Sequence, residues 1–547
     1  MDSFDSDAGV RDRGCSLRSA VLALLRCASV MVAFAISLNA QIDEAKILEG
    51  PTENWLTYSG DYASTRHSSL DQIKTSNVSS LVPKWVFHVR DATKLETTPL
   101  VFDGVMYISN TNEVYAVDAV TGRSIWHHRS DGGVGRQNRG VALWGDGLFF
   151  ITVDCHLVKL DRLTGSLIWD QEFASNAEGY SSSLAPLVVK GQVLVGTAGG
   201  GSGQRGFVGA LSASTGEELW RFWTVPGDGQ PGSETWGGFP AKWSGAPTWT
   251  TGSYDPELNL IYWPTGNPWP DFAGIRRRGD NLYSDSVVAL DADSGEMKWY
   301  FQFTPHDTHD WDANEQLVLI DKEFKGRMRK LMLHADRNGY YYVLDRATGE
   351  YLLGTPFVEK LDWATGLDAK GRPIEVPNLE PSPSGVKVCP SVRGATNWMS
   401  PSINPDIGLL YVVTLEMCDI YTGSAKEPVP SSGFRGTGRD PVPSEPGQFY
   451  LRALDATTGE KKWEYEMTGP ARMWGGTVST AGGLVFTADD DGALIALNAR
   501  TGEELWYFST GHDMYASPMT FMAEGKQYVT IATETDVFTF GLFEPVD

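Results

Sequence analysis

Acidic and imidazole side chains are concentrated in the segment PHDTHDWD, residues 305–312. His306, His309 and Asp310 are residue types that bind zinc, so a zinc site is one interpretation of this segment. Two histidines spaced H-x-x-H converge on a helix but not on a strand or loop, and no third histidine motif accompanies them. On an extended backbone Asp310 and Asp312 would share one face, whereas on any other backbone Asp312 would be a surface acid.

Arg337 and Trp249 are two further residues that could do chemistry. Arg337, in ADRNG, lies between the apolar stretches KLMLH and YYYVLD. An unpaired charge between buried strands would be costly, so Arg337 should have a partner inside the protein. Trp249, in PTWTT, presents a large planar surface and lies outside the tryptophan-bearing repeat described next.

A repeat positions these residues. An apolar residue, Asp or a substitute, a T-G pair and then Trp recur along the chain. The copies are AVDAVTGRSIW (116–126), KLDRLTGSLIW (159–169), ALSASTGEELW (210–220), ALDADSGEMKW (289–299), the degenerate VLDRATGEYLL (343–353), ALDATTGEKKW (453–463) and ALNARTGEELW (496–506). Each copy reads as a short strand, a tight turn at the T-G pair and a second strand. We expect its Trp to pack on a neighbouring unit.

The period predicts an all-β fold, an eight-bladed β-propeller with tryptophan-docking motifs. Ala116 and Lys159 are 43 residues apart, as are Ala453 and Ala496, and this spacing matches one four-stranded blade. Wider gaps, such as 343–453, should hold insertions on one face. Strand-like sequences at both ends of the repeat region would combine into an eighth blade and close the ring. A β-sandwich array is the alternative, but it would not place Trp at a fixed offset from T-G.

Composition indicates an exported protein with one domain. The 547 residues carry a formal net charge of −24, which argues against a nucleic-acid partner. Basic residues precede an apolar run from Cys27 to about Ala40 that is too short to span a bilayer. We expect residues 1–40 to be a cleaved export signal, residues 41–547 to form a single propeller domain without a membrane span, and the mature protein to be periplasmic. A wrongly assigned start followed by a disordered tail is the alternative.

The cysteines divide between the expected signal and the mature chain. Cys155, Cys389 and Cys418 lie after residue 40, and an exported chain can form disulfides. Cys389 and Cys418 are the natural pair, which leaves Cys155 as a lone thiol. The sequence contains no CxxCH, so no c-type haem is attached.

The T-G-x-x-x-W units resemble the tryptophan-docking motifs of the PQQ-dependent (pyrroloquinoline quinone) alcohol and methanol dehydrogenases. The resemblance runs from about Trp55 to Phe543 and includes LETTPLV, QNRGVAL, GGGSGQRGF, PTGNPWP, PHDTHDWD, ADRNG, VCPSVRGATNW and RMWGG. It implies a quinoprotein dehydrogenase that oxidises a hydroxyl-bearing substrate, which could be an alcohol, a polyol or a sugar. It also implies a separate periplasmic cytochrome c or quinone as electron acceptor, and it allows a homodimer. The Cys389–Cys418 pair matches a disulfide position of the family.

PQQ is a flat tricarboxylate o-quinone, so it needs stacking surfaces, cations or donors for its carboxylates, and an electrophilic clamp at its C5 carbonyl. By the resemblance, Trp249 corresponds to the stacking floor and Arg337 to the arginine at C5. Other positions that match the cofactor site are Glu96, Arg139, Ser183, Gly199, Gly200, Asn397 and Trp474.

The resemblance also assigns the acid–base and metal roles. Asp310 corresponds to the general base that takes the hydroxyl proton while hydride passes to the quinone. A Ca²⁺ or lanthanide ion acts as Lewis acid in the family, and Asn267, Asp310 and Asp312 are the matching ligand positions. Asp312 stands where lanthanide-using members place an extra carboxylate.

The sequence departs from the family at two places. The adjacent cysteine pair is absent, with Gly133 and Val134 in its position, and Gly201 replaces the metal-binding glutamate. Without that glutamate the cation has too few oxygen ligands unless Asp312, Ser202, water or the quinone supplies more. A loop that caps the cofactor is also missing, which predicts an open pocket. A non-catalytic or degenerate PQQ propeller, acting as a binding or scaffold protein, is therefore the alternative function.

Overall fold

The computed structural model describes residues 41–132, 137–424, 429, 435–443 and 445–545. Residues Asp43–Asp547 form one compact unit. The expected export signal, residues 1–40, and the positions Gly133 and Val134 lie outside the described residues.

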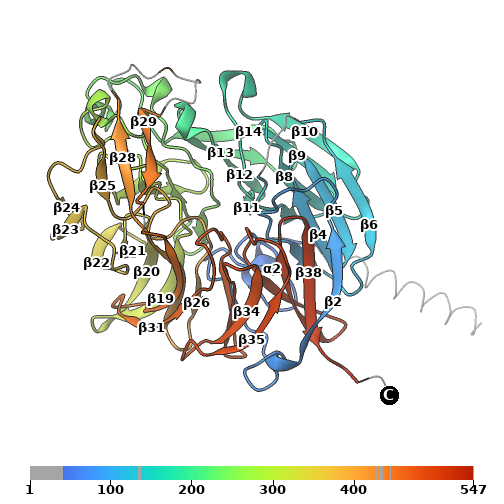
Figure 1. The fold of residues 1–547 in the computed structure, drawn as a ribbon. Coiled ribbons are helices and arrows are strands. Elements are labelled where there is room, and N and C mark those ends of the chain that lie inside the picture. Colours follow the sequence, from blue (N-terminus) through green and yellow to red (C-terminus); the bar gives the residue numbers. More distant parts are fainter. Residues whose placement is uncertain (1–40, 133–136, 425–428, 430–434, 444, 546–547) are drawn as a thin grey trace, which may run out of the picture. The chain divides into compact units, whose positions relative to one another are not determined.

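The described residues form eight sheets of four or five strands, here called blades 1 to 8 (Figure 1). Blade 1 contains β3 (Leu100–Phe102), β4 (Val105–Asn110), β5 (Glu113–Asp118) and β6 (Ser124–Arg129). Blade 2 contains β7 (Ala142–Trp144), β8 (Gly147–Ile151), β9 (His156–Asp161) and β10 (Leu167–Glu172). Blade 3 contains β11 (Leu187–Val189), β12 (Gln192–Gly196), β13 (Phe207–Ser212) and β14 (Glu218–Trp223). Blade 4 contains β15 (Ser253–Asp255), β16 (Leu260–Pro264), β17 (Ser286–Asp291) and β18 (Met297–Gln302).

The later blades include the two that depart from simple chain order. Blade 5 contains β19 (Val318–Phe324), β20 (Arg327–Ala335), β21 (Tyr340–Asp345) and β22 (Glu350–Pro356). Blade 6 contains β26 (Ser402–Asn404), β27 (Leu409–Glu416), β30 (Gln448–Asp455) and β31 (Lys461–Glu466). Blade 7 contains β32 (Thr477–Thr480), β33 (Leu484–Ala488), β34 (Ala493–Asn498), β35 (Glu504–Ser509) and the short parallel β1 (His67–Ser68). Blade 8 contains β36 (Met519–Ala523), β37 (Lys526–Ala532), β38 (Asp536–Leu542) and β2 (Leu81–His88).

Blade 8 joins the two ends of the repeat region, as the sequence predicts. Strand β2 pairs with β38 in antiparallel register, from Leu81 opposite Leu542 to His88 opposite Asp536. Every backbone group that β2 uses in this pairing would otherwise stand at an open sheet edge. The fold is therefore the all-β, eight-bladed propeller that the repeat indicates.

The repeat tryptophans dock blade to blade. A Cβ atom built on Gly165 of blade 2 would lie 2.6 Å from the Trp126 ring of blade 1, and one on Gly502 of blade 7 would lie 2.6 Å from the Trp463 ring of blade 6. Only glycine lets an indole lie so close to the turn. The indole nitrogen then donates to a neighbouring carbonyl, as from Trp126 to Arg162 O (3.1 Å).

The degenerate fifth copy shows what the motif contributes. Leu353 replaces its Trp, and the glycine that would receive the ring, Gly459, instead faces Thr355 and Tyr341. Trp85 of β2, which the repeat pattern missed, docks on Gly122 and donates to Ala119 O (3.1 Å). Its sequence signal is absent because the turn of blade 8 has no T-G pair before the strand.

Insertions fill the gap between blade 5 and the end of blade 6. Strands β23 (Ala364–Leu367) and β24 (Pro373–Glu375) form one small sheet, and β25 (Val386–Val388), β28 (Asp419–Gly423) and β29 (Thr437–Pro441) form another (Figure 1). The disulfide Cys389–Cys418 joins the segments that follow β25 and precede β28. It therefore braces the insertion, as expected, and Cys155 is a buried free thiol.

Helices are short in the described residues. The α-helix is α2 (Glu44–Leu48), and the 3₁₀ helices are η1 (Val78–Ser80), η2 (Asn176–Glu178), η3 (Gly200–Ser202), η4 (Ser233–Trp236), η5 (Ala241–Trp243) and η6 (Gly274–Arg276). None of these described helices has the length and apolar character that crossing a membrane requires.

Candidate active site

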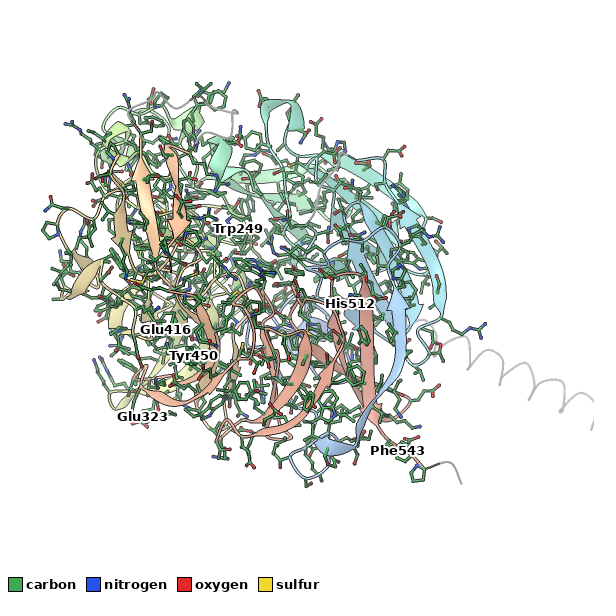
Figure 2. All side chains as sticks on the ribbon, in the orientation of Figure 1. Trp249, Glu323, Glu416, Tyr450, His512 and Phe543 are labelled. Carbon is green, nitrogen blue, oxygen red and sulfur yellow. A yellow bond between two sulfur atoms is a disulfide. The ribbon has the colours of Figure 1, made fainter. Side chains whose placement is uncertain are left out.

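Loops from seven blades meet at one pocket of about 520 Å³. It is lined by all the predicted site residues except Ser183, namely Glu96, Arg139, Gly199, Gly200, Trp249, Asn267, Asp310, Asp312, Arg337, Asn397 and Trp474. These residues lie in loops before or between the strands of seven blades, so the ring brings together positions that are hundreds of residues apart. In Figure 2 Trp249 lies nearer the middle of the view than Glu323 and Phe543.

Aromatic rings and one guanidinium form one end of the pocket. The Arg139 Cζ atom lies 5.0 Å from the ring centre of Trp249 and 4.6 Å from that of Trp398. Trp398 and Trp474 are nearly parallel, with ring centres 6.2 Å apart. Flat π surfaces beside a cation are suited to a planar anionic ligand.

Buried hydrogen bonds fix Arg139. Its Nη2 lies 2.7 Å from Glu96 Oε2, and its Nη1 donates to Ser183 Oγ at 2.7 Å. Lys94, which the sequence analysis missed, lies 2.6 Å from the other Glu96 oxygen. Ser183 therefore lies behind Arg139 and orients it. Two cations share one carboxylate, so this end of the pocket keeps a surplus positive charge for an anionic ligand.

Carboxylates dominate the part of the pocket around Asp312, whose Oδ1 accepts from Trp249 Nε1 at 3.4 Å. Arg337 Nη1 lies 2.6 Å from Asp312 Oδ2, and Arg337 Nη2 donates to the carbonyl oxygens of Asp310 (2.6 Å) and Val392 (2.5 Å). Asp312 Oδ1 also accepts from the backbone nitrogen of Asn267 at 2.9 Å. Arg337 thus has the internal partner that its position between two strands predicts.

The loop that carries Asp310 is not extended. Residues 305–316 lie between β18 and β19, and Asp310 has φ +64°, a left-handed conformation that is uncommon for a residue other than glycine. Strand alternation therefore does not align Asp310 with Asp312, and the alternative, a surface position for Asp312, is wrong because this residue is buried. Both side chains nevertheless line the pocket, because the fully buried Trp311 between them anchors the loop in the core and donates to Ser391 O.

Burial and crowding raise the pKa values of these acids. Burial first, and then the charges of Asp271 and Asp312, raise the pKa of Asp310 well above its ordinary range, while Arg435 and Arg337 oppose the rise. Burial likewise raises the pKa of Asp271 to about 6, opposed mainly by Arg435. A carboxyl group with a raised pKa is a stronger base than usual, as an acceptor of a hydroxyl proton needs to be.

The oxygen donors at this end fit a hard cation. Asp310, Asp312 and Asn267 line the pocket, and Asp271, which the sequence analysis missed, lies fully buried beside them. Three carboxylates face the two guanidinium groups of Arg337 and Arg435, which leaves a net negative charge. Gly201 contributes no side-chain ligand, so in the folded site no side chain at position 201 replaces the glutamate that binds metal in the family.

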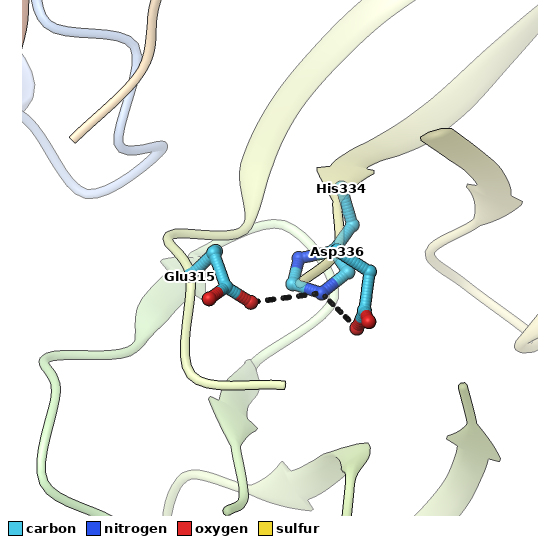
Figure 3. A group of neighbouring side chains, drawn as sticks. All are labelled: Glu315, His334 and Asp336. Carbon is cyan, nitrogen blue, oxygen red and sulfur yellow. Dashed lines mark hydrogen bonds and ion pairs between the residues drawn. The ribbon is translucent and has the colours of Figure 1, made fainter. Parts of the chain in front are cut away.

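Glu315, His334 and Asp336 form a buried acid–histidine group (Figure 3), and Asp336 directly precedes Arg337 in the chain. His334 Nε2 lies 3.0 Å from Asp336 Oδ2 and 3.8 Å from Glu315 Oε2, and all three side chains are buried. Asp336 Oδ1 also accepts from the backbone nitrogen of Asn338 at 2.8 Å, which shapes the turn that presents Arg337. These three residues have no repeated spacing in the sequence, so no motif predicts the group.

The two histidines of PHDTHDWD are engaged elsewhere. His306 Nδ1 lies 2.8 Å from Gly279 O, and His309 Nε2 lies 3.1 Å from Leu379 O. His309 also stacks on Trp311. Burial lowers the pKa of His309 to about 4, so its ring is neutral and structural at ordinary pH.

The chain matches a known protein family and several of its members. Residues 55–360 and 468–529 match the family model described as "PQQ: Glucose/ethanol/alcohol dehydrogenase, beta-propeller domain". The quinoprotein alcohol dehydrogenase PedH of Pseudomonas putida is 38% identical over 534 residues, which cover 90% of this chain and 89% of the relative. The quinohemoprotein alcohol dehydrogenase of Comamonas testosteroni is 37% identical over 521 residues, covering 88% of this chain and 72% of that protein.

Solved structures agree with these matches. The crystal structure of the Comamonas testosteroni quinohemoprotein alcohol dehydrogenase superposes with a TM-score of 0.87 at 33% identity, over 94% of this chain and 84% of that one. A europium-containing methanol dehydrogenase gives a TM-score of 0.84 at 30% identity, over 90% of this chain and 98% of that one. Together with a pocket that fits a planar anionic quinone, these similarities show that the chain belongs to the PQQ-dependent quinoprotein alcohol dehydrogenases and is an oxidoreductase of that family.

Proposed function

We propose that this protein oxidises a hydroxyl-bearing substrate with PQQ, using Asp310 as the general base. The observation that carries the proposal is one pocket that is lined by Asp310 and Arg337 together with Arg139 and the tryptophans Trp249 and Trp474. An acid end and a cationic, aromatic end are both needed to hold a planar tricarboxylate next to a base.

The chain's own residues divide the work of holding PQQ. Trp249 offers a stacking face, while Arg139, oriented by Glu96 and Ser183, offers a cation to its carboxylates. Asn397, Trp474, Gly199 and Gly200 would line its edges. When bound, PQQ supplies a redox-active o-quinone that accepts two electrons from the substrate.

Arg337 is placed to meet an acceptor in the pocket. Its two terminal nitrogens are taken up by Asp312, Asp310 O and Val392 O, but its buried Nε–H has no hydrogen-bond partner among the described residues. A buried donor without a partner is costly, and a carbonyl oxygen of a bound ligand would satisfy it. We assign to this group the electrophilic contact with the quinone carbonyl.

Asp310 accepts the proton of the substrate hydroxyl on its carboxylate in this proposal. The side chain lines the pocket and is largely enclosed, which favours proton uptake. Arg337 and Arg435 oppose this rise in the pKa of Asp310 and favour its charged form. The balance between these effects sets the pH at which the base works.

A Ca²⁺ or lanthanide ion would be held by Asn267, Asp310 and Asp312. It would supply a Lewis-acid charge that polarises the quinone. The europium in a similar methanol dehydrogenase and the carboxylate at Asp312 support a lanthanide, while Gly201 removes one ligand that either ion would use.

The proposed setting is the periplasm, reached through an export signal at residues 1–40. Electrons would leave to a separate cytochrome c or quinone, because the chain has no CxxCH site of its own. The open pocket favours a primary alcohol, a polyol or a sugar as substrate. Residues 41–547 would act as a single propeller domain.

Reconstitution tests the proposal. The purified chain is loaded with PQQ and either Ca²⁺ or La³⁺, and dye reduction is followed with primary alcohols, polyols and aldoses. We expect turnover with at least one class, and a loss of about 10²–10⁴-fold in Asp310→Asn with PQQ absorbance retained. Asp440→Asn, an exposed change of equal charge on β29, is the control.

Two results would contradict the proposal. Retained turnover in Asp310→Asn would remove Asp310 from the role of base. PQQ binding without turnover for any substrate and metal, in a folded wild-type protein, would instead identify a ligand-binding propeller.

A further inference from the structure

Arg435 occupies the place where the family's metal-binding carboxylate is missing. A Cβ atom built on Gly201 would lie 2.6 Å from Nη2, 2.7 Å from Cζ and 2.8 Å from Nε of Arg435. The guanidinium therefore lies flat against Gly201. Relative to an acidic residue at 201, this corner of the pocket has lost one negative charge and gained one positive charge.

The same guanidinium pairs with two carboxylates of the site. Its Nη1 lies 3.2 Å from Asp310 Oδ2, and its Nε lies 3.4 Å from Asp271 Oδ2. Asp310 is a proposed metal ligand and Asp271 lies beside Asn267. Arg435 thus makes contacts that a metal ion between these residues would make.

The backbone around Arg435 is fixed while its side chain is accessible. Its carbonyl oxygen accepts from the backbone nitrogen of Phe272 at 2.8 Å, and Gly436, at φ +100°, packs so tightly on Ala273 that a Cβ atom would lie 2.8 Å from the alanine methyl. The Arg435 side chain itself is 50% exposed, against 7% for Arg337. The docking fixes the main chain of Arg435, and the exposed side chain has room to rotate towards solvent.

We propose that Arg435 is a protein-supplied cation that competes with the metal for Asp310 and Asp271, so that the metal binds only after the guanidinium has left these carboxylates. The inference rests on the proposed function in so far as it uses the same metal site. Arg435 is then a positioning residue, because it acts through Asp310. In the absence of metal, its positive charge offsets the negative charges of Asp310 and Asp271.

Metal affinity in the protein without PQQ tests this directly. The probe is Tb³⁺, whose luminescence is sensitised by a nearby indole such as Trp249, so the readout does not need turnover. Arg435→Gln should bind Tb³⁺ at least tenfold more tightly than the wild type, because a unit charge is removed within contact distance of the ligands. Arg435→Lys should stay close to the wild type.

A matched control separates competition from a general charge effect. Lys94→Gln removes another pocket cation, but one whose partner is Glu96 at the opposite end. We expect it to change Tb³⁺ affinity less than threefold. An equal gain in Lys94→Gln and Arg435→Gln would overturn the proposal.

A double-variant cycle gives a second readout. Gly201→Glu should strengthen Tb³⁺ binding strongly in Arg435→Gln, where the space is free, and weakly in the wild type, where the guanidinium fills it. Equal gains in both backgrounds would show that Arg435 does not occupy the ligand position. Unchanged or weaker binding in folded Arg435→Gln, or no Tb³⁺ binding in any folded variant, would also overturn the inference, whereas failure of the proposed function appears separately as absent turnover with PQQ.

Discussion

Nη1 of Arg337 and Oδ2 of Asp312 lie 2.6 Å apart, with only 7% and 10% of the two side chains exposed. The pair joins the turn after β20 to the loop that carries Asp310. It therefore holds both the proposed electrophile and the proposed base in place.

We expect Asp312→Asn to destabilise the protein by about 3–5 kcal/mol, because it removes the carboxylate that pairs directly with the buried guanidinium of Arg337. Asp280→Asn breaks an exposed pair with Arg372 and should cost less than about 1 kcal/mol. Urea unfolding of the two variants measures the difference. Equal costs would mean that the Arg337 pair adds nothing beyond a surface ion pair.

The docking of Trp463 on Gly502 predicts an unequal effect of two alanine substitutions. Gly502 and Gly104 both have φ +75°, but a Cβ atom meets Trp463 at 2.6 Å in the first and nothing within 4 Å in the second. Both changes incur the left-handed cost of about 1–2 kcal/mol. Gly502→Ala should cost about 1–3 kcal/mol more, from displacement of the indole, in thermal or urea unfolding. Equal losses of stability in the two variants would show that the Trp463 indole moves aside at no cost in free energy.

The disulfide should stabilise the insertion whose Val392 carbonyl accepts a hydrogen bond from Arg337. Cys389 and Cys418 are 29 residues apart in sequence, and a bridge of that length contributes about 3–4 kcal/mol by restricting the unfolded chain. The double variant Cys389→Ser with Cys418→Ser should unfold at lower urea than the wild type. Cys155→Ala, which removes a thiol without opening a bridge, is the comparison. A loss under about 1 kcal/mol would contradict the expectation.

His309 should make the protein sensitive to mild acid. Burial lowers its pKa from 6.5 to about 4 in the folded state. The unfolded chain therefore takes up this proton more readily, and the free energy of unfolding should fall as pH falls from about 6.5 to about 4, by about 3 kcal/mol in total. His309→Gln should lose less stability across this window, while the exposed His88→Gln should follow the wild type. Parallel curves for all three proteins would exclude His309 as the cause.

Much of the propeller was predictable because the repeat encodes it locally. The T-G turn and the following Trp specify each strand pair and its contact with the next blade, as Trp126 on Gly165 shows. The same reasoning failed for Trp85, whose blade is assembled from distant segments. The resemblance to the family predicted the pocket residues because each lies within a recognisable sequence segment, such as Arg337 in ADRNG.

The remaining features depend on tertiary docking. Asp310 adopts its left-handed backbone because Trp311 is anchored in the core, and nothing in PHDTHDWD indicates this by spacing alone. Arg435 reaches the pocket only because Gly436 packs on Ala273, more than 160 residues earlier in the chain. A lone arginine in an insertion carries no periodic signal in the sequence, so its position in the pocket is evident only in the folded protein.

The pairing of β2 with β38 also has a kinetic meaning. Leu81 meets Leu542, so the last sheet cannot form until nearly the whole chain has been synthesised. Until then blades 1 and 7 lack the neighbour that contacts Gly122 and Trp506, and the ring that surrounds the pocket is open. Maturation of the cofactor site is thus tied to completion of the polypeptide, and a nick or truncation before β38 should release both ends together rather than fray one blade.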